Sequence, residues 1–153
     1  MKIVAQNKKA FHDYTVLETI ETGIVLTGDE VKSLRAGKGN LTGSFVVPKN
    51  GELFMINANI SAYSHAYQKN VSDDYAMRSR KLLLHRREID RLVGDVSRKG
   101  ITLVPLKLYF KNGKIKVEVG LCKHKKAHER KEEIRERDIK RETRRELTGK
   151  YDY

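Results

Sequence analysis

Three side chains with metal-binding chemistry lie close together at and just after the end of the last predicted strand: Cys122, His124 and His128. Histidines four residues apart share one face of a helix, and a thiolate would complete the three ligands of a metal-dependent nuclease. Three lysines stand among them, and the segment lacks the acidic ligands that such a nuclease needs. We therefore expect no metal. Cys122 is interpreted as a small strand-end residue, and His128 as a ring that can stack on a base.

Other catalytic patterns in the chain are incomplete. The Gly-Lys-Gly turn at residues 37–39 resembles a phosphate loop, but Lys32 stands where the first glycine belongs and Gly39 where a Ser or Thr belongs. Asp73 and Asp74 fall in a polar loop without a second acid or base beside them, which favours a solvated loop. No nucleophile elbow and no His-Glu-x-x-His sequence occurs. The sequence predicts a protein that is not an enzyme and needs no cofactor.

The segment that follows the last strand is basic and carries few apolar side chains. Its core-type residues up to Lys150 are Ala127, Ile134, Ile139 and Leu147. They do not recur at the spacing that buries one face of a helix, so packing on the same chain cannot offset the ordering entropy. Acid-first pairs four residues apart still favour helix slightly. We expect this tail, residues 123–153, to be disordered when free and helical when bound to a polyanion.

Charge indicates nucleic acid as the partner. The chain holds 32 Lys and Arg against 20 Asp and Glu, a net charge of +12. Residues 121–153 contribute 12 basic and 8 acidic side chains, a net of +4, which leaves +8 on the body. A single lysine can equally belong to a solvated face, but together these positions favour phosphate contact. The candidate contacts in the body are Asn7, Lys8, Lys9, Lys32, Arg35, Lys38, Asn40, Lys81 and Lys116.

The body, residues 1–122, carries the pattern of a small antiparallel β-barrel. Short β-rich runs occur at residues 14–26, 44–47 and 53–57, and two longer ones flank Asn112-Gly113, a strong hairpin signal. A helix is predicted from Asp29 as N-cap, and an amphipathic helix over residues 86–97. The sequence therefore predicts a mainly β chain, an OB-like barrel with two to three short helices.

The cysteine and apolar content indicate where the protein is located, and one polar segment is a candidate ligand-binding loop. The chain has one cysteine and no apolar stretch long enough for a membrane span, which favours a soluble, cytoplasmic monomer. Residues 61–79 are polar and aperiodic, and Tyr63, Tyr67 and Tyr75 lie within them. Those rings can either dock on the core or stack on bases.

Several long blocks of the chain resemble the SmpB family of SsrA-binding proteins. They are Asn7–Tyr14, Glu21–Leu26, Glu30–Lys38, Arg80–Ile89, Val104–Gly113 and Lys123–Glu129. The resemblance covers nearly the whole chain from Asn7. It implies an OB-like barrel that binds the tRNA-like domain of tmRNA and delivers it to stalled bacterial ribosomes for trans-translation. Small-subunit rRNA at the decoding centre and mRNA channel would be the second partner.

The resemblance also implies roles for particular residues. Glu21, Leu83 and Lys116 match RNA-binding positions, although an apolar Leu83 is more naturally core support than a contact. The tail would lie in the empty mRNA channel, and its matching residues are His128, Glu129, Arg130 and Lys131. We expect the basic residues just before them, Lys123, Lys125 and Lys126, to contact the ribosome as well. His124 stands where many relatives carry glycine. The alternative function is a general RNA-binding or ribosome-associated OB-fold protein without a specific tmRNA partner.

Overall fold

The chain is mainly β, as predicted. The structure, a computed structural model, describes residues 1–61, 73–97, 100–125 and 135–141. Its strands are β1 (Lys2–Gln6), β2 (Tyr14–Ile24), β3 (Gly39–Asn40), β4 (Phe45–Lys49), β5 (Glu52–Ile56), β6 (Asn59–Ile60), β7 (Arg80–Leu83), β8 (Ile101–Lys111) and β9 (Lys114–His124). Its short helices are α1 (Lys8–Asp13), α2 (Gly28–Arg35), α3 (Asp73–Ala76) and α4 (Arg86–Val96). The described part of the body thus has four helices, where the sequence predicts two to three.

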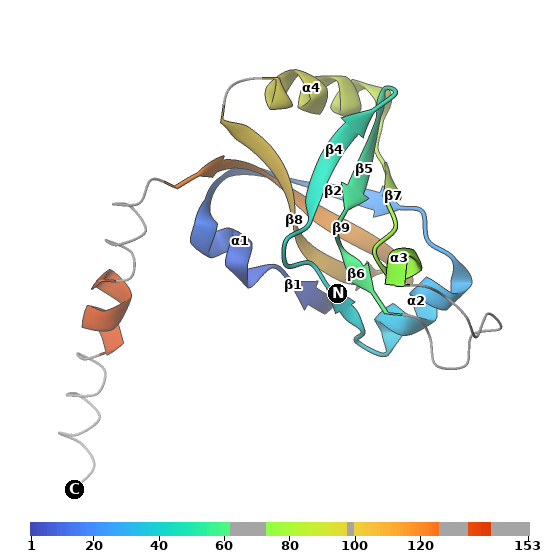
Figure 1. Cartoon of the computed structure of the whole chain (residues 1–153), viewed down its shortest axis with the longest axis horizontal. Helices are drawn as coiled ribbons and strands as arrows, with labels where there is room; N and C mark the ends of the chain where they lie inside the picture. Colours follow the sequence, from blue (N-terminus) through green and yellow to red (C-terminus); the bar gives the residue numbers. More distant parts are fainter. Residues whose placement is uncertain (62–72, 98–99, 126–134, 142–153) are drawn as a thin grey trace, which may run out of the picture.

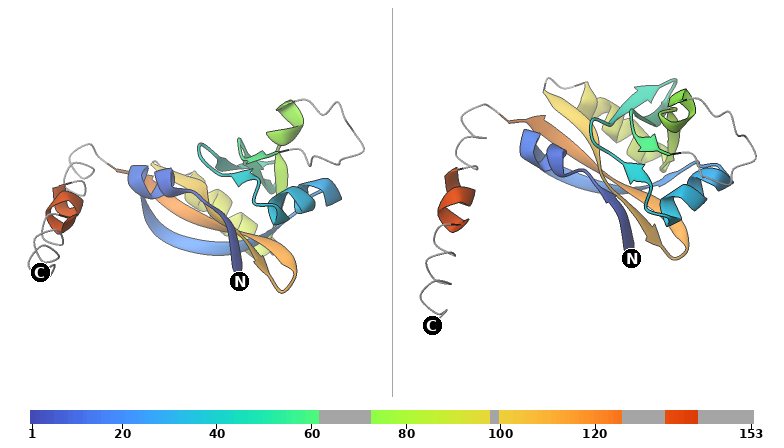
Figure 2. Two further views of the ribbon diagram at one scale, coloured as in Figure 1. Left: turned by 90° about the horizontal axis from the view of Figure 1, so that it is seen from below. Right: turned by 60° about the horizontal axis from the view of Figure 1, so that its bottom comes forward.

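The strands form an antiparallel barrel (Figures 1 and 2). Its order is β8-β4-β5-β7-β2-β9, and the pairing of β9 with β8 closes the ring. β1 adds to β8 on the outside of this ring, with Ile3 opposite Tyr109. The two longest pairings are β8 with β9 and β2 with β9, so β9 is the strand that ties the barrel together. The OB-like fold is confirmed.

A single apolar core fills the barrel. Its fully buried members include Leu53, Met55, Leu82, Leu103, Leu108 and Val117. Helix α4 lies across one end and adds Ile89 and Leu92, as its apolar spacing predicts (Figure 1). Along β9, Val117, Val119 and Leu121 alternate inward as expected for a strand.

A smaller second cluster lies outside the barrel wall, beneath α1. It consists of Ala10, Val104, Leu106 and Cys122. Gly120 of β9 is needed here, because a Cβ at this position would lie 2.7 Å from the Leu106 side chain. The six-residue α1 has no apolar stripe long enough to be read from the sequence, which explains why it was not predicted.

Turn chemistry follows the sequence at both hairpins. Asn112-Gly113 and Asn50-Gly51 all adopt positive φ, between 52° and 75°, as type I′ turns require. The predicted helix start at Asp29 is wrong by two residues. Thr27 is the N-cap of α2, and its side chain and that of Glu30 form a reciprocal capping box.

The C-terminal part leaves the barrel later than the predicted boundary at residue 122. β9 continues to His124, opposite Tyr14 of β2. Beyond it the structure describes a helical segment, residues 135–141, in which every side chain is exposed. Within the described parts of the chain, no helix has the length and apolarity to cross a bilayer.

Candidate RNA-binding surface

Leu83, Gly23 and Lys116 form a row across three neighbouring strands. Gly23 of β2 pairs with Leu83 of β7 on one side and with Lys116 of β9 on the other. A Cβ on Gly23 would come within 3.1 Å of the Leu83 Cβ, so the glycine makes room for the leucine. The row borders a surface hollow of about 400 Å³, lined also by Val31 and Lys114.

Leu83 does not support the core, and that expectation is wrong. Its side chain is 50% exposed, whereas the neighbouring Leu82 is 1% exposed. Side chains of a strand alternate between its two faces, so burial of Leu82 in the barrel places Leu83 on the outer face. An exposed leucine beside two lysines is available for contact with a ligand.

Glu21 lies on β2 two residues before Gly23 and shares its outer face. The Tyr109 hydroxyl donates to Glu21 Oε2 at 2.5 Å, and Lys111 Nζ lies 3.3 Å from the same oxygen. The Tyr109 hydrogen bond, together with Lys111 and the charge of Lys116, lowers the pKa of Glu21. Burial and the Glu21 carboxylate raise the pKa of Tyr109. The surface therefore holds an ionised, oriented carboxylate among cations.

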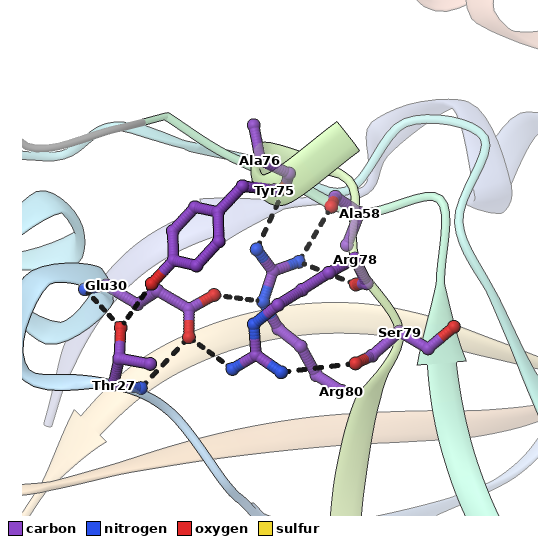
Figure 3. Close-up of polar contacts among 8 residues, drawn as sticks. All are labelled: Thr27, Glu30, Ala58, Tyr75, Ala76, Arg78, Ser79 and Arg80. Atoms are coloured by element: carbon purple, nitrogen blue, oxygen red, sulfur yellow. Dashed lines mark hydrogen bonds and ion pairs between the residues drawn. The ribbon is translucent and has the colours of Figure 1, made fainter. Parts of the chain in front are cut away.

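Helix α2 is fixed beside this surface by a buried ion network (Figure 3). Glu30 is 1% exposed and accepts from Arg80 Nε at 2.5 Å and from Arg78 Nη2. Burial raises the pKa of Glu30, but hydrogen bonds from Arg78, the Thr27 N–H and Arg80 outweigh it, so the pKa lies below its usual value. The Tyr75 hydroxyl bonds to Thr27 Oγ1 at 2.8 Å. Tyr75 is thus docked on α2 rather than presented for stacking.

The predicted basic residues of the body fall into two groups at opposite ends of β2. Lys32, Arg35 and Lys38 are exposed on or just after α2, whose Val31 lines the same hollow as Leu83. Lys8 and Lys9 are exposed on α1, which lies at the other end (Figure 1). The structure thus places α2, through Val31, beside the hollow that Leu83 and Lys116 line, and it places α1 with Lys8 and Lys9 at the other end of β2. Lys81, also predicted, forms an ion pair with Glu52 at 2.8 Å.

Asn7 and Asn40 serve the fold. Asn7 is 2% exposed, and its Nδ2 donates to the carbonyls of Leu41 and Pro105, while its Oδ1 caps α1 through the Ala10 N–H. Direct RNA contact by Asn7 is therefore a wrong expectation, because its side chain is enclosed and engaged. Asn40 is exposed, and its Oδ1 accepts from the Thr42 N–H at 2.9 Å.

Cys122 and His124 have no shared metal chemistry in the structure. Cys122 is fully buried, and burial raises the pKa of its thiol to about 11, which opposes formation of a thiolate ligand. The His124 ring is exposed and packs on Tyr14, with centroids 4.7 Å apart. Across the described residues, no group of three His, Cys, Asp or Glu side chains could hold a metal ion.

Of the predicted tail contacts, Lys123 and Lys125 lie within the described residues. Lys123 is exposed, near the end of β9. Lys125 is 8% exposed, and its ammonium donates to the Phe11 carbonyl at 3.0 Å. The expected ribosome contacts at Lys126, His128, Glu129, Arg130 and Lys131 lie outside the described residues, as do Tyr63 and Tyr67. Asp73 and Asp74 begin α3.

Four residues that shape this surface were not predicted from the sequence. Tyr109 and Lys111 hold Glu21 from β8, on the far side of β9 from β2, and this placement follows only from the registers of β8 with β9 and of β2 with β9. Arg78 and Arg80 hold α2 from fifty residues away. The one hint in the sequence is the charge of Arg80 so close to the apolar run that begins at Leu82. A buried arginine needs an acidic partner such as Glu30.

The closed antiparallel barrel and its lysine-rimmed outer face define a small basic OB-like protein of the nucleic-acid-binding type. The chain belongs to the SmpB family: the model of that family, described as "SmpB protein", matches residues 4–149. The SsrA-binding protein of Acetivibrio thermocellus is 52% identical over 146 residues, covering 95% of this chain and 93% of that protein. That of Shouchella clausii is 53% identical, covering 95% and 92%.

A solved structure shares the fold as well as the sequence. It is described as "tmRNA-SmpB: a journey to the center of the bacterial ribosome". Its matching chain is 52% identical, with a TM-score of 0.65, and the match covers 80% of this chain and 84% of that one.

Proposed function

We propose that this protein is an RNA-binding adaptor that binds the tRNA-like domain of tmRNA and delivers it to stalled bacterial ribosomes for trans-translation. It catalyses no reaction itself. The observation that carries the proposal is the convergence of Glu21, Leu83 and Lys116 on one outer face of the barrel, beside a hollow of about 400 Å³. Family membership and the tmRNA-SmpB structure support the same RNA partner.

Each group on this face has a distinct use toward RNA. Lys114 and Lys116, with Lys32 beside them on α2, supply charge for the phosphate backbone. Leu83 offers apolar contact to a ribose or an unstacked base. Glu21 is an acceptor, so it pairs with a base amino group or a 2′-hydroxyl rather than with phosphate. Acceptors and apolar groups add selectivity that lysines alone lack.

The tail takes the second role, on the ribosome. In the helical segment 135–141 all seven side chains are exposed, and four basic residues stand against two acidic ones. Such a helix needs a polyanionic surface to be stably ordered. We propose that the tail occupies the empty mRNA channel near the decoding centre, where a bound message would exclude it. The tail then distinguishes stalled ribosomes from translating ones.

A truncation separates the two roles. The truncated protein ends at Lys125, so that it keeps the buried Cys122 and the hydrogen bond from Lys125 to the Phe11 carbonyl. Both versions are titrated with the tRNA-like domain of tmRNA against bulk tRNA at near-physiological salt. We expect equal, selective binding by both, and peptide tagging on stalled ribosomes by the full chain only.

The alternative is a general RNA-binding or ribosome-associated protein. It predicts that neither version discriminates between the tRNA-like domain and bulk tRNA. It also predicts that truncation lowers the affinity for every RNA by a similar factor, since only charge would matter. Either result would refute the proposed adaptor function.

A further inference from the structure

We propose that Lys125 is an internal anchor that sets where the tail leaves the barrel, and that it is not an RNA contact. For the functional consequence, this inference rests on the proposed role of the tail. The structural part rests on contacts within the chain alone. Lys125 thereby differs in kind from the exposed Lys123 two residues earlier.

Two hydrogen bonds tie Lys125 to the end of α1. The Lys125 N–H donates to the Asp13 carbonyl at 3.0 Å, which extends the β2–β9 side of the barrel by one residue. The ammonium turns back and donates to the Phe11 carbonyl, also at 3.0 Å. Both acceptors belong to the last turn of α1, so the main chain and the side chain of Lys125 bind the same helix end.

Electrostatics favour this arrangement. The last carbonyls of a helix carry partial negative charge and lack partners within the helix, so a cation there is stabilising. Lys125 is 8% exposed, and a lysine is seldom buried this far without a partner for its charge. Its ammonium is therefore engaged within the protein, by the Phe11 carbonyl, rather than extended toward a ligand as an exposed lysine would be.

The residues before Lys125 are fixed as well. His124 pairs with Tyr14 across β9 and β2, and the two rings pack together. The chain is thus held by strand pairing to His124 and by α1 at Lys125. As a consequence, α1 with its exposed Lys8 and Lys9 and the start of the tail move as one body.

The anchor lies far from the proposed tmRNA surface. Along β2, Gly23, beside Leu83, comes nine positions after Tyr14, beside the anchor. At about 3.3 Å per residue this is a separation of roughly 25–30 Å along the curved strand. Loss of the anchor should therefore impair the tail and spare binding of the tRNA-like domain.

The test compares Lys125→Met with Lys123→Met in the full chain. Both remove one positive charge and keep a long apolar stem, but Lys123 is exposed. Hydrogen exchange is followed at the amide of residue 125, which donates to the Asp13 carbonyl in the parent. Affinity for the tRNA-like domain and tagging on stalled ribosomes are measured in parallel. We expect exchange about tenfold faster in Lys125→Met alone, since an anchoring hydrogen bond to a charged group is lost.

In function, we expect Lys125→Met to keep the affinity within about twofold and to lower tagging well below that of Lys123→Met. Equal exchange in the two variants would overturn the anchor. Faster exchange with equal tagging would overturn its role in the tail. A parent protein that shows no selective affinity for the tRNA-like domain would refute the proposed function instead, and the exchange result would still decide the anchor.

Discussion

Glu30→Gln tests how α2 is held, and its cost follows from the burial of the network. Glu30 is 1% exposed, and Arg80 is fully buried with its guanidinium bonded to Glu30 and to the carbonyls of Ala58 and Ala76 (Figure 3). Removing the carboxylate leaves the Arg80 charge without its counterion. Breaking a buried pair in this way costs about 3–5 kcal/mol. For a chain of this size that lowers Tm by about 6–20 °C.

The matched control is Glu18→Gln, which breaks an exposed ion pair with Arg91. Side chains of that pair are about half exposed, so the change should cost less than about 1 kcal/mol. Urea unfolding and thermal melts of both variants and the parent provide the comparison. Equal losses in the two variants would contradict the reasoning, because burial would then not decide the energy of the pair. The comparison uses reversible unfolding transitions in which the dependence of the unfolding free energy on urea concentration is the same for all three proteins.

Acidification should destabilise the parent more steeply than Glu30→Gln, as urea titrations between pH 6 and 3 would show. Folding lowers the pKa of Glu30, so the ionised carboxylate contributes its full stabilisation above its unfolded-state pKa of about 4.3. That stabilisation is lost as the pH falls through the folded-state pKa. Leu83→Ala should change the free energy of unfolding by less than about 1 kcal/mol, because the side chain is half exposed, yet it should weaken binding to the tRNA-like domain about fivefold. A large loss of stability would instead show that Leu83 supports the core. Lys116→Gln should reduce the slope of log affinity against log salt by about 0.7–0.9, and an unchanged slope would show that Lys116 contacts no phosphate.

Local sequence signals predicted most of the elements. The Asn112-Gly113 and Asn50-Gly51 turns, the apolar spacing of α4 and the alternation along β9 each depend on neighbours within a few residues. Such short-range patterns specify an element regardless of what packs against it. The start of α2 was misplaced because Asp29 and Thr27 are both good N-caps, and the choice of Thr27 depends on Glu30, three residues on.

The site was predicted less completely because its geometry depends on long-range pairing. Leu83 looked like part of a buried run, and only the packing of Leu82 into the barrel shows that Leu83 faces outward. Asn7 and Lys125 carry residue types typical of RNA contact, yet each is buried against chain segments distant in sequence. The residue type defines which contacts a side chain can make, whereas the fold determines whether it faces a ligand or the protein interior.

The placement of the two basic groups has a mechanistic consequence. Glu21, Leu83 and Lys116 stand at one end of β2, whereas Lys8, Lys9 and the start of the tail stand at the other. One RNA bound at the Leu83 end therefore leaves α1 and the tail accessible to a second. Because β2 and β9 run unbroken between the two ends apart from one register shift, the barrel acts as a spacer of fixed length. We infer that joining the two partners requires no change within the barrel, since β2 and β9 present the Leu83 end and the α1 end at the same time.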